Sequence, residues 1–94
     1  MEVTVQVPTA LRELTGGRSM LTFDLEEEAT IAQLLEAVAT AHPTLERRIR
    51  DEQGALRTHV NLFVGDENVR TLAGTATTLP PGASVSILAA ISGG

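Results

Sequence analysis

The residues of this sequence best suited to chemistry are the two glycines that end it, Gly93 and Gly94. Neither has a Cβ, so this segment can adopt backbone angles closed to other residues and can enter a narrow channel. A terminal α-carboxyl has a pKa of about 3.3–3.7, so at neutral pH Gly94 carries a carboxylate, which is a poor electrophile until it is activated. The sequence thus predicts either a reactive terminus on a short flexible tail, residues 92–94, or a frayed end without a role.

The other candidate catalytic groups form no constellation. The two histidines, His42 and His59, are far apart in the sequence and have no clustered carboxylates near them. His42 precedes Pro43 at the end of a predicted helix, where a capping role accounts for it. The sequence has no cysteine, which excludes disulfides, thiol nucleophiles and thiolate metal sites. We therefore expect that the chain is not an enzyme and that it binds no metal and no cofactor itself.

Length and charge narrow the function further. The 94 residues are enough for one domain, and we assign it residues 1–91. The net charge of −5 disfavours nucleic acid and anionic membranes as partners. No stretch approaches the roughly 20 apolar residues of a membrane span, and no basic leader precedes the first strand, which indicates a cytoplasmic protein. All seven basic residues are arginines, so no amide bond can be made onto a lysine of this chain.

The first 25 residues predict a β-hairpin. Apolar and polar residues alternate over 3–7 and again over 19–25, which is the pattern of half-buried strands, and Pro8 ends the first run. Residues 9–15 suit a turn or a single helical turn, and the glycines at 16–17 allow the chain to reverse. Two strands joined this closely are most simply antiparallel.

A helix follows the hairpin. Thr30 and Gln33 have the spacing of a capping box, and apolar residues recur at helical spacing from Ile31 to Ala41 before Pro43 closes the helix. Residues 44–50 suit a short further helical piece, and 51–56 suit a loop.

The second half of the chain returns to strands. Residues 58–64 alternate, 69–72 suit a short strand, and Pro80 to Gly82 is a strong turn signal. The run 84–91 is almost wholly apolar in its second half, which is typical of a strand in the middle of a sheet. One main helix must then lie across one face of a mixed sheet of four to five strands, with the last strand beside the first. This α+β arrangement is a β-grasp fold.

The predicted sheet has a second face that lacks a cover. If Val85 and Ile87 face the helix, Leu88 and Ala90 face outward, and Phe63 lies with them. An uncovered apolar patch on a small protein marks a docking surface, to which we also assign Pro8. Since residues 92–94 reach at most about 10 Å, a partner that acts on Gly94 must contact this surface too. The alternative is that the helical piece at 44–50 folds over it.

Three segments resemble a known family. These are VTVQVPTALRELTGG at the start, VNLFVGDENVR in the middle and ISGG at the end. Together they resemble the ubiquitin-like sulfur carriers of the MoaD/ThiS superfamily over essentially the whole chain. The Gly-Gly end is common to that superfamily, while the length and the segments PTALRELTGG and DENVR are most similar to the CysO-type carrier of O-phosphoserine-dependent cysteine synthesis. The ending AAISGG departs slightly from the AVAGG-like ending usual there.

The resemblance implies a specific chemistry for Gly94. An adenylating enzyme akin to ubiquitin activators would use ATP to form an acyl-adenylate on its carboxylate, and a sulfur donor would convert this to a thiocarboxylate. In the cysteine branch a cysteine synthase that uses pyridoxal phosphate would accept the sulfur, cysteine would end amide-linked to Gly94, and a metallopeptidase would release it. Arg12, in the family-like LREL segment, could pair with an acidic group of the activating enzyme. Arg70 is a further candidate for docking.

Two other functions stay open on the same residues. The first is the small subunit of molybdopterin synthase, whose tail inserts into a larger catalytic subunit, or a carrier for another sulfur-containing metabolite. The second is a ubiquitin-like protein modifier or a non-catalytic adaptor. The final acceptor, the sulfur donor and the oligomeric state belong to other chains or to solution behaviour, and the sequence does not determine them.

Overall fold

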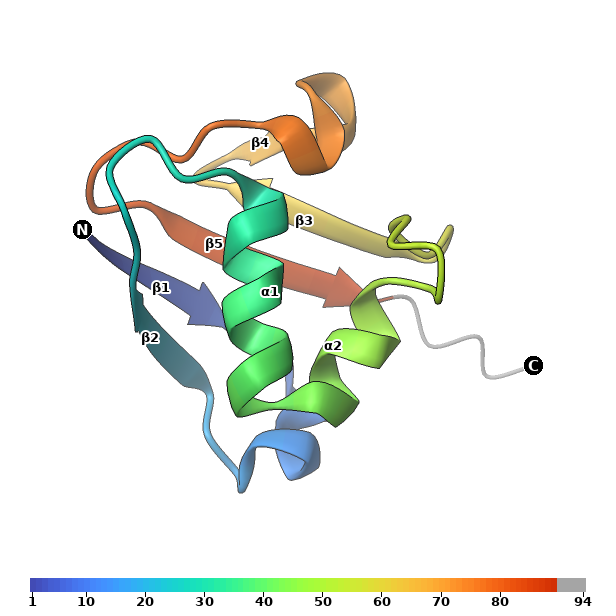
Figure 1. Ribbon diagram of the computed structural model, residues 1–94. Coiled ribbons are helices and arrows are strands. Elements are labelled where there is room, and N and C mark those ends of the chain that lie inside the picture. Colours follow the sequence, from blue (N-terminus) through green and yellow to red (C-terminus); the bar gives the residue numbers. More distant parts are fainter. Residues whose placement is uncertain (90–94) are drawn as a thin grey trace.

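The computed structural model describes residues 1–89, which form a five-stranded mixed sheet with α-helices on one face (Figure 1). The strand order is β2-β1-β5-β3-β4, with β5 in the centre. β5 runs parallel to β1 and antiparallel to β3. The strands are β1 (Glu2–Gln6), β2 (Met20–Asp24), β3 (Val60–Val64), β4 (Glu67–Asn68) and β5 (Ser84–Ala89). The β-grasp fold is therefore confirmed, and so is the position of the last strand beside the first.

The hairpin β1-β2 forms where the alternating residues predict it. Its strands are antiparallel, with Val5 opposite Leu21. A 3₁₀-helix, η1 (Thr9–Thr15), connects them, in agreement with the helical turn expected there. Gly16 ends η1 in the left-handed region with φ +68°, a conformation in which a Cβ would be strained. The buried Thr15 hydroxyl donates to the carbonyls of Arg12 and Arg18, and it thereby closes the turn.

The main helix, α1 (Ile31–Ala41), begins at the predicted cap. The Thr30 hydroxyl accepts from the Gln33 backbone N–H, and the Gln33 side chain accepts from the Thr30 N–H, so two of the free donors at the helix start are satisfied. His42 is its C-cap, as expected from its place before Pro43. The buried stripe of α1 faces the sheet and consists of Ile31, Leu34, Leu35 and Val38.

A second helix, α2 (Pro43–Ile49), packs beside α1 on the same face of the sheet (Figure 1). Leu45 and Ile49 are fully buried in the common core. The alternative that residues 44–50 cover the opposite face is therefore wrong. The physical reason is the tight connection at His42: because Pro43 is already the first residue of α2, the chain has no length in which to cross the sheet.

The region after β3 differs from its sequence-based prediction. Gly65, with φ +59°, opens a two-residue turn to β4. The strand predicted at 69–72 is wrong, because Val69–Thr71 form the 3₁₀-helix η2 and a second one, η3, spans Gly74–Ala76. The cause lies in Asn68, whose side-chain oxygen accepts from the Arg70 N–H and turns the chain out of the extended conformation.

The core lies between the sheet and the two α-helices. Residues that alternate inward from four strands form the layer of the core next to the sheet, and they include Val3, Val5, Leu21, Val60, Leu62, Val85 and Ile87. Within the described residues, neither helix has the length and apolar character that crossing a membrane requires.

Candidate functional site

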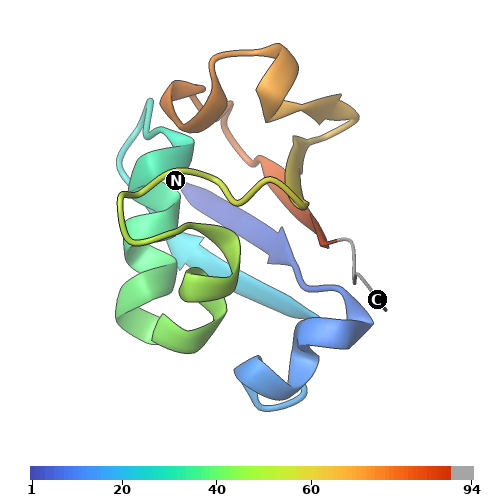
Figure 2. The ribbon, with the colours of Figure 1, turned by 90° about the vertical axis from the view of Figure 1, so that its right-hand side faces the viewer.

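The face of the sheet opposite the helices is uncovered along the described chain (Figure 2). We call it the outer face. Strand pairing places on it the residues that alternate with the core, and Met20 and Leu88 are each 52% exposed. The outer face is formed by Thr4, Gln6, Met20, Thr22, Asn61, Phe63, Ser86 and Leu88. Apolar side chains of this size on open surface of a small protein indicate a docking area.

The two apolar residues that the sequence predicts for this surface are neighbours. Phe63 is the register partner of Ser86, and Leu88 lies two residues further along β5 on the same face. A diagonal neighbour at this spacing is within reach of an aromatic side chain. Phe63 is half-buried and Leu88 is exposed. The predicted outward orientation of both residues is confirmed.

Pro8 and Arg12 follow β1 at the end of the sheet where β5 also ends. β1 and β5 are parallel, with Gln6 opposite Ser86, so Pro8 and Leu88 each follow two residues after a paired position. Arg12 is half-buried, and its Nε donates to the carbonyl of Val7 at 3.0 Å, which holds η1 against the end of β1. Arg12 thus has a structural contact within the chain, and its pairing with an activating enzyme stays a prediction.

Three predicted site residues lie outside the described part of the chain. These are Ala90, Gly93 and Gly94, and the last described residue before them is Ala89. The structure does describe Ala89, the residue that precedes them in the sequence. Ala89 is opposite Val60, the first residue of β3, and lies at the same end of the sheet as Pro8. In the sequence, Gly93 and Gly94 come four and five residues after the last described residue of the central strand.

One residue of this region, Met20, is additional to the predicted docking set, and the predicted candidate Arg70 has contacts within the chain. Met20 extends the apolar surface at the far strand, and the alternation in 19–25 that places Leu21 inward already indicated it. Arg70, which the sequence marks only as a further candidate, donates to the side chain of Asn61 and to the carbonyls of Arg57 and Val60. Nothing in the spacing of the sequence predicts these three contacts, because they depend on how η2 packs on β3.

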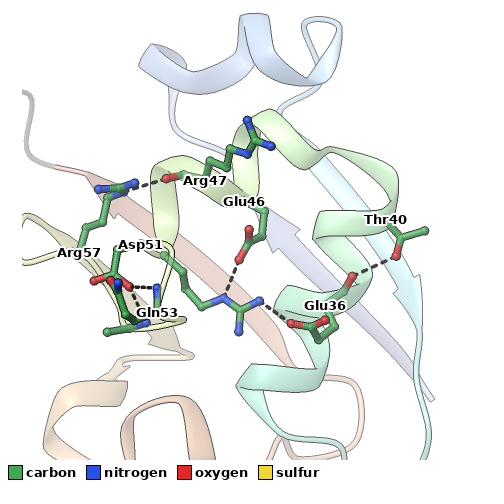
Figure 3. A network of polar contacts seen from close by, with 9 residues as sticks. Glu36, Thr40, Glu46, Arg47, Asp51, Gln53 and Arg57 are labelled. Atoms are coloured by element: carbon green, nitrogen blue, oxygen red, sulfur yellow. Dashed lines mark hydrogen bonds and ion pairs between the residues drawn. The ribbon is translucent and has the colours of Figure 1, made fainter.

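The strongest charge cluster lies elsewhere, among α1, α2 and the loop that follows them (Figure 3). Arg50 donates to Glu46 at 2.6 Å and to Glu36 at 2.7 Å. Burial disfavours the charged form, but the hydrogen bonds and charges of Glu36 and Glu46 outweigh it and raise the pKa of the Arg50 guanidinium. The carboxylate of Asp51 accepts from two N–H groups of its own loop. A cavity of about 650 Å³ opens here, and its walls include these charged residues together with others of α2 and of the loop that follows it.

The cluster stabilises the helix layer and brings no reactive group to the outer face. Each of its charged side chains described above forms a hydrogen bond with a neighbour, so we interpret the cluster as structural. Across residues 1–89, no three histidine or carboxylate side chains lie close enough to hold a metal ion. The outer face and the end of β5 therefore stay the candidate docking area of the described residues.

Comparison with known proteins agrees with this fold. The sequence profile of the ThiS family matches residues 5–94. The chain belongs to the ThiS family. This ThiS-family chain is 38% identical over its full length to the sulfur carrier protein CysO of Mycobacterium tuberculosis, and the match covers 100% of both chains. The crystal structure of that CysO superposes with a TM-score of 0.83, covering 95% of this chain and 99% of the other.

Two further matches are a protein described as a modifier and a chain from the structure of a complex. The small archaeal modifier protein 3 of Haloferax volcanii is 29% identical over 94 residues, again covering 100% of both chains. The second is a chain in a crystal structure described as the BexX/CysO complex of Amycolatopsis orientalis. It is 33% identical to this ThiS-family chain and superposes with a TM-score of 0.82. The match covers 98% of this chain and 99% of the other. The resemblance inferred from three short segments thus extends over the whole chain.

Proposed function

We propose that this protein is a sulfur carrier of the CysO type, and that its working group is the α-carboxylate of Gly94. The observation that carries the proposal is that the sequence ends in Gly-Gly a few residues after Ala89, the last described residue of a central strand that borders an uncovered apolar face. The full-length similarity to a sulfur carrier protein CysO supports it independently. The chain acts in this role as a co-substrate of partner enzymes and not as an enzyme.

The chemistry proceeds in two steps on the Gly94 carboxyl group, the first at its oxygen and the second at its carbon. First the Gly94 carboxylate attacks the α-phosphorus of ATP within an adenylating enzyme, and pyrophosphate leaves. Next a sulfide-level donor adds to the carbonyl carbon, and AMP leaves as the C–O bond breaks, so that a thiocarboxylate remains. The absence of a Cβ at Gly93 and Gly94 keeps both faces of this carbonyl open to the attacking group. A cysteine-free chain has no thiol of its own that could react with the stored sulfur.

The outer face supplies the contact with the activating enzyme. Leu88, Phe63 and Met20 form its apolar part, and Pro8 borders it where β5 ends. A docked partner receives the Gly94 carboxylate and buries this patch at the same time, which gives the complex its affinity. That a CysO is found in complex with BexX supports a carrier that works through such docking.

Cysteine synthesis is the destination that we propose for the sulfur. The acceptor would be a cysteine synthase that holds pyridoxal phosphate, and a metallopeptidase would then release cysteine from Gly94. ATP and pyridoxal phosphate belong to these partner enzymes in this scheme. The basis is the CysO similarity, which covers the whole chain. We place the reaction in the cytoplasm, where these partners operate.

The test is the intact mass of the protein after incubation with ATP, an adenylating enzyme and a sulfide source. We expect one terminal oxygen to be replaced by sulfur. The variant that lacks Gly94 is the matched control, since it keeps every described contact of the fold but should acquire no sulfur. Sulfur loading that is equal in the two proteins would reject the proposal.

A second candidate function is protein modification, which the similarity to a small archaeal modifier protein favours. The same activated terminus would then form an isopeptide bond with a lysine of another protein. Because this chain has no lysine, such a modifier could not be extended through its own side chains. Mass spectrometry of cell extract would detect adducts that carry the Gly94 carbonyl on lysine, and their absence alongside thiocarboxylate would leave the carrier function.

A further inference from the structure

The end of β5 rests on one neighbouring strand. β1 pairs with β5 over Ser84–Ser86 only. The last three described residues, Ile87–Ala89, pair with Val60–Leu62 of β3. Beyond the last pairing of β1, which is Gln6 with Ser86, β3 is the only described strand that pairs with the end of β5. The position of Ala89 depends on how firmly the first residues of β3 are themselves held.

The free edge of β3 at this point is occupied by a side chain. β4 pairs with β3 only at Phe63 and Val64, so it ends before reaching the first residues of β3. Beside those residues lies Arg70, whose Nη2 donates to the carbonyls of Val60 and Arg57, both at 2.7 Å. Its Nε donates to Oδ1 of Asn61 at 3.1 Å. The guanidinium thus takes the place of a neighbouring strand where β4 is missing.

Arg70 is held in turn by the residues around it. Its backbone N–H donates to Oδ1 of Asn68 at 3.0 Å, and Nδ2 of Asn68 donates to Oδ1 of Asn61 at 3.1 Å. The Val60 N–H donates to the carbonyl of Arg57, which closes the turn before β3. These contacts form a closed network that links η2 to the beginning of β3. A planar guanidinium can satisfy several acceptors in one fixed geometry, which a single ammonium group cannot do.

We propose that Arg70 is a positioning residue for the reactive terminus, a role that rests on the proposed function of Gly94. By fixing the start of β3, Arg70 fixes the end of β5 and so the direction in which the chain leaves the sheet at Ala89. A displacement of reacting atoms by about 1 Å lowers the rate of an enzymatic step by about 100-fold. Because Gly94 comes five residues after Ala89, we expect a smaller effect on the rate than this: a firmly held Ala89 sets where the tail of a docked carrier begins, and a loosely held one slows the conversion of the Gly94 carboxylate.

The first test needs no partner. Amide hydrogen exchange is measured at Leu88, whose N–H faces β3 in this register, in the wild type, in Arg70→Ala and in Arg70→Lys. We expect exchange to be about tenfold faster in both variants, because the strand end opens locally without global unfolding. The Val3 and Val5 amides are the internal reference. Arg48→Ala, which removes an exposed arginine of α2, is the matched control. Unchanged exchange at Leu88 in Arg70→Lys, which keeps charge and stem, would overturn the proposal.

The second test separates positioning from a direct contact with the partner. In sulfur loading by the activating enzyme, we expect both Arg70 variants to lower kcat about tenfold while KM changes by less than about twofold. A charge that contacts the partner would instead raise KM in Arg70→Ala and be restored in Arg70→Lys, and that outcome contradicts positioning. If the wild type itself takes up no sulfur, the proposed function fails, while the exchange experiment still decides the role of Arg70 in holding β5.

Discussion

Ile87 and Leu88 are adjacent in β5 and have opposite environments. Ile87 is 2% exposed beneath the helices, whereas Leu88 is 52% exposed on the outer face. The difference comes from the pleat alone, because successive side chains of a strand point to opposite faces. One face of the sheet stabilises the fold, and the other is available to a partner. A single strand therefore contributes to both, and substitutions on it should separate stability from docking.

The largest effect on stability should come from the inner face. Ile87→Ala removes a fully buried side chain and leaves a cavity between β5 and α1, so we expect the free energy of unfolding to fall by about 2–5 kcal/mol. Chemical denaturation followed by circular dichroism measures it. A loss below about 1 kcal/mol would mean that the inner face is not the main source of stability.

The neighbouring substitution should break docking instead. Leu88→Ser removes an exposed apolar side chain, and we expect the free energy of unfolding to change by less than about 0.5 kcal/mol. KM for the activating enzyme should rise about tenfold, which corresponds to about 1.4 kcal/mol of binding free energy. Steady-state kinetics of sulfur loading checks this. If KM is unchanged while Phe63→Ser is also without effect, the outer face is not the docking surface.

A substitution in the helix layer should have an intermediate effect on the free energy of unfolding. Arg50→Gln removes the partner of Glu46, whose side chain is 15% exposed, so we expect a loss of about 1–3 kcal/mol of stability and normal sulfur loading. The pKa of Arg50 is raised in the folded state, so its contribution is complete at any pH below its unfolded value and is lost only as the pH rises through the folded value. The difference between variant and wild type should stay constant from about pH 7 to 10. A decline within that range would contradict the assignment.

The smallest effect concerns the connection that leads from β2 to α1. Glu28 adopts φ +63°, in the left-handed region that favours glycine. Glu28→Gly should raise the free energy of unfolding by about 0.5 kcal/mol, since relief of strain exceeds the added entropy of the unfolded chain. Glu27→Gly, at the preceding residue, should lower it. Thermal denaturation distinguishes the two, and a matching decrease in both would show that Glu28 is not strained.

The sequence predicts the inner face well because its signals are local. The alternation from Val3 to Val7, the capping box at Thr30 and the apolar stripe of α1 each lie within one element, and each is confirmed. The strand predicted at 69–72 is wrong because the interaction that prevents it joins the Asn68 side chain to the Arg70 backbone. Weak β-patterning loses to a single side-chain hydrogen bond there.

The candidate site also combines features that local sequence patterns predict with features that depend on packing. The outward orientation of Phe63 and Leu88 follows from period-two alternation, and the structure confirms it. Whether that face stays open depends on where α2 packs, which no local pattern decides. Pro8 and Arg12 come next to the end of β5 only because β1 and β5 are parallel neighbours.

By itself the sequence determined which residues alternate, where the main helix begins and that a Gly-Gly pair follows the last strand. These are properties of neighbouring residues, and the steric and hydrogen-bonding rules that govern them act over a few positions. Only the tertiary structure decided that both helices occupy one face and that Arg70 takes the place of a strand beside Val60. Those outcomes join residues ten or more positions apart, and they depend on packing of the whole chain.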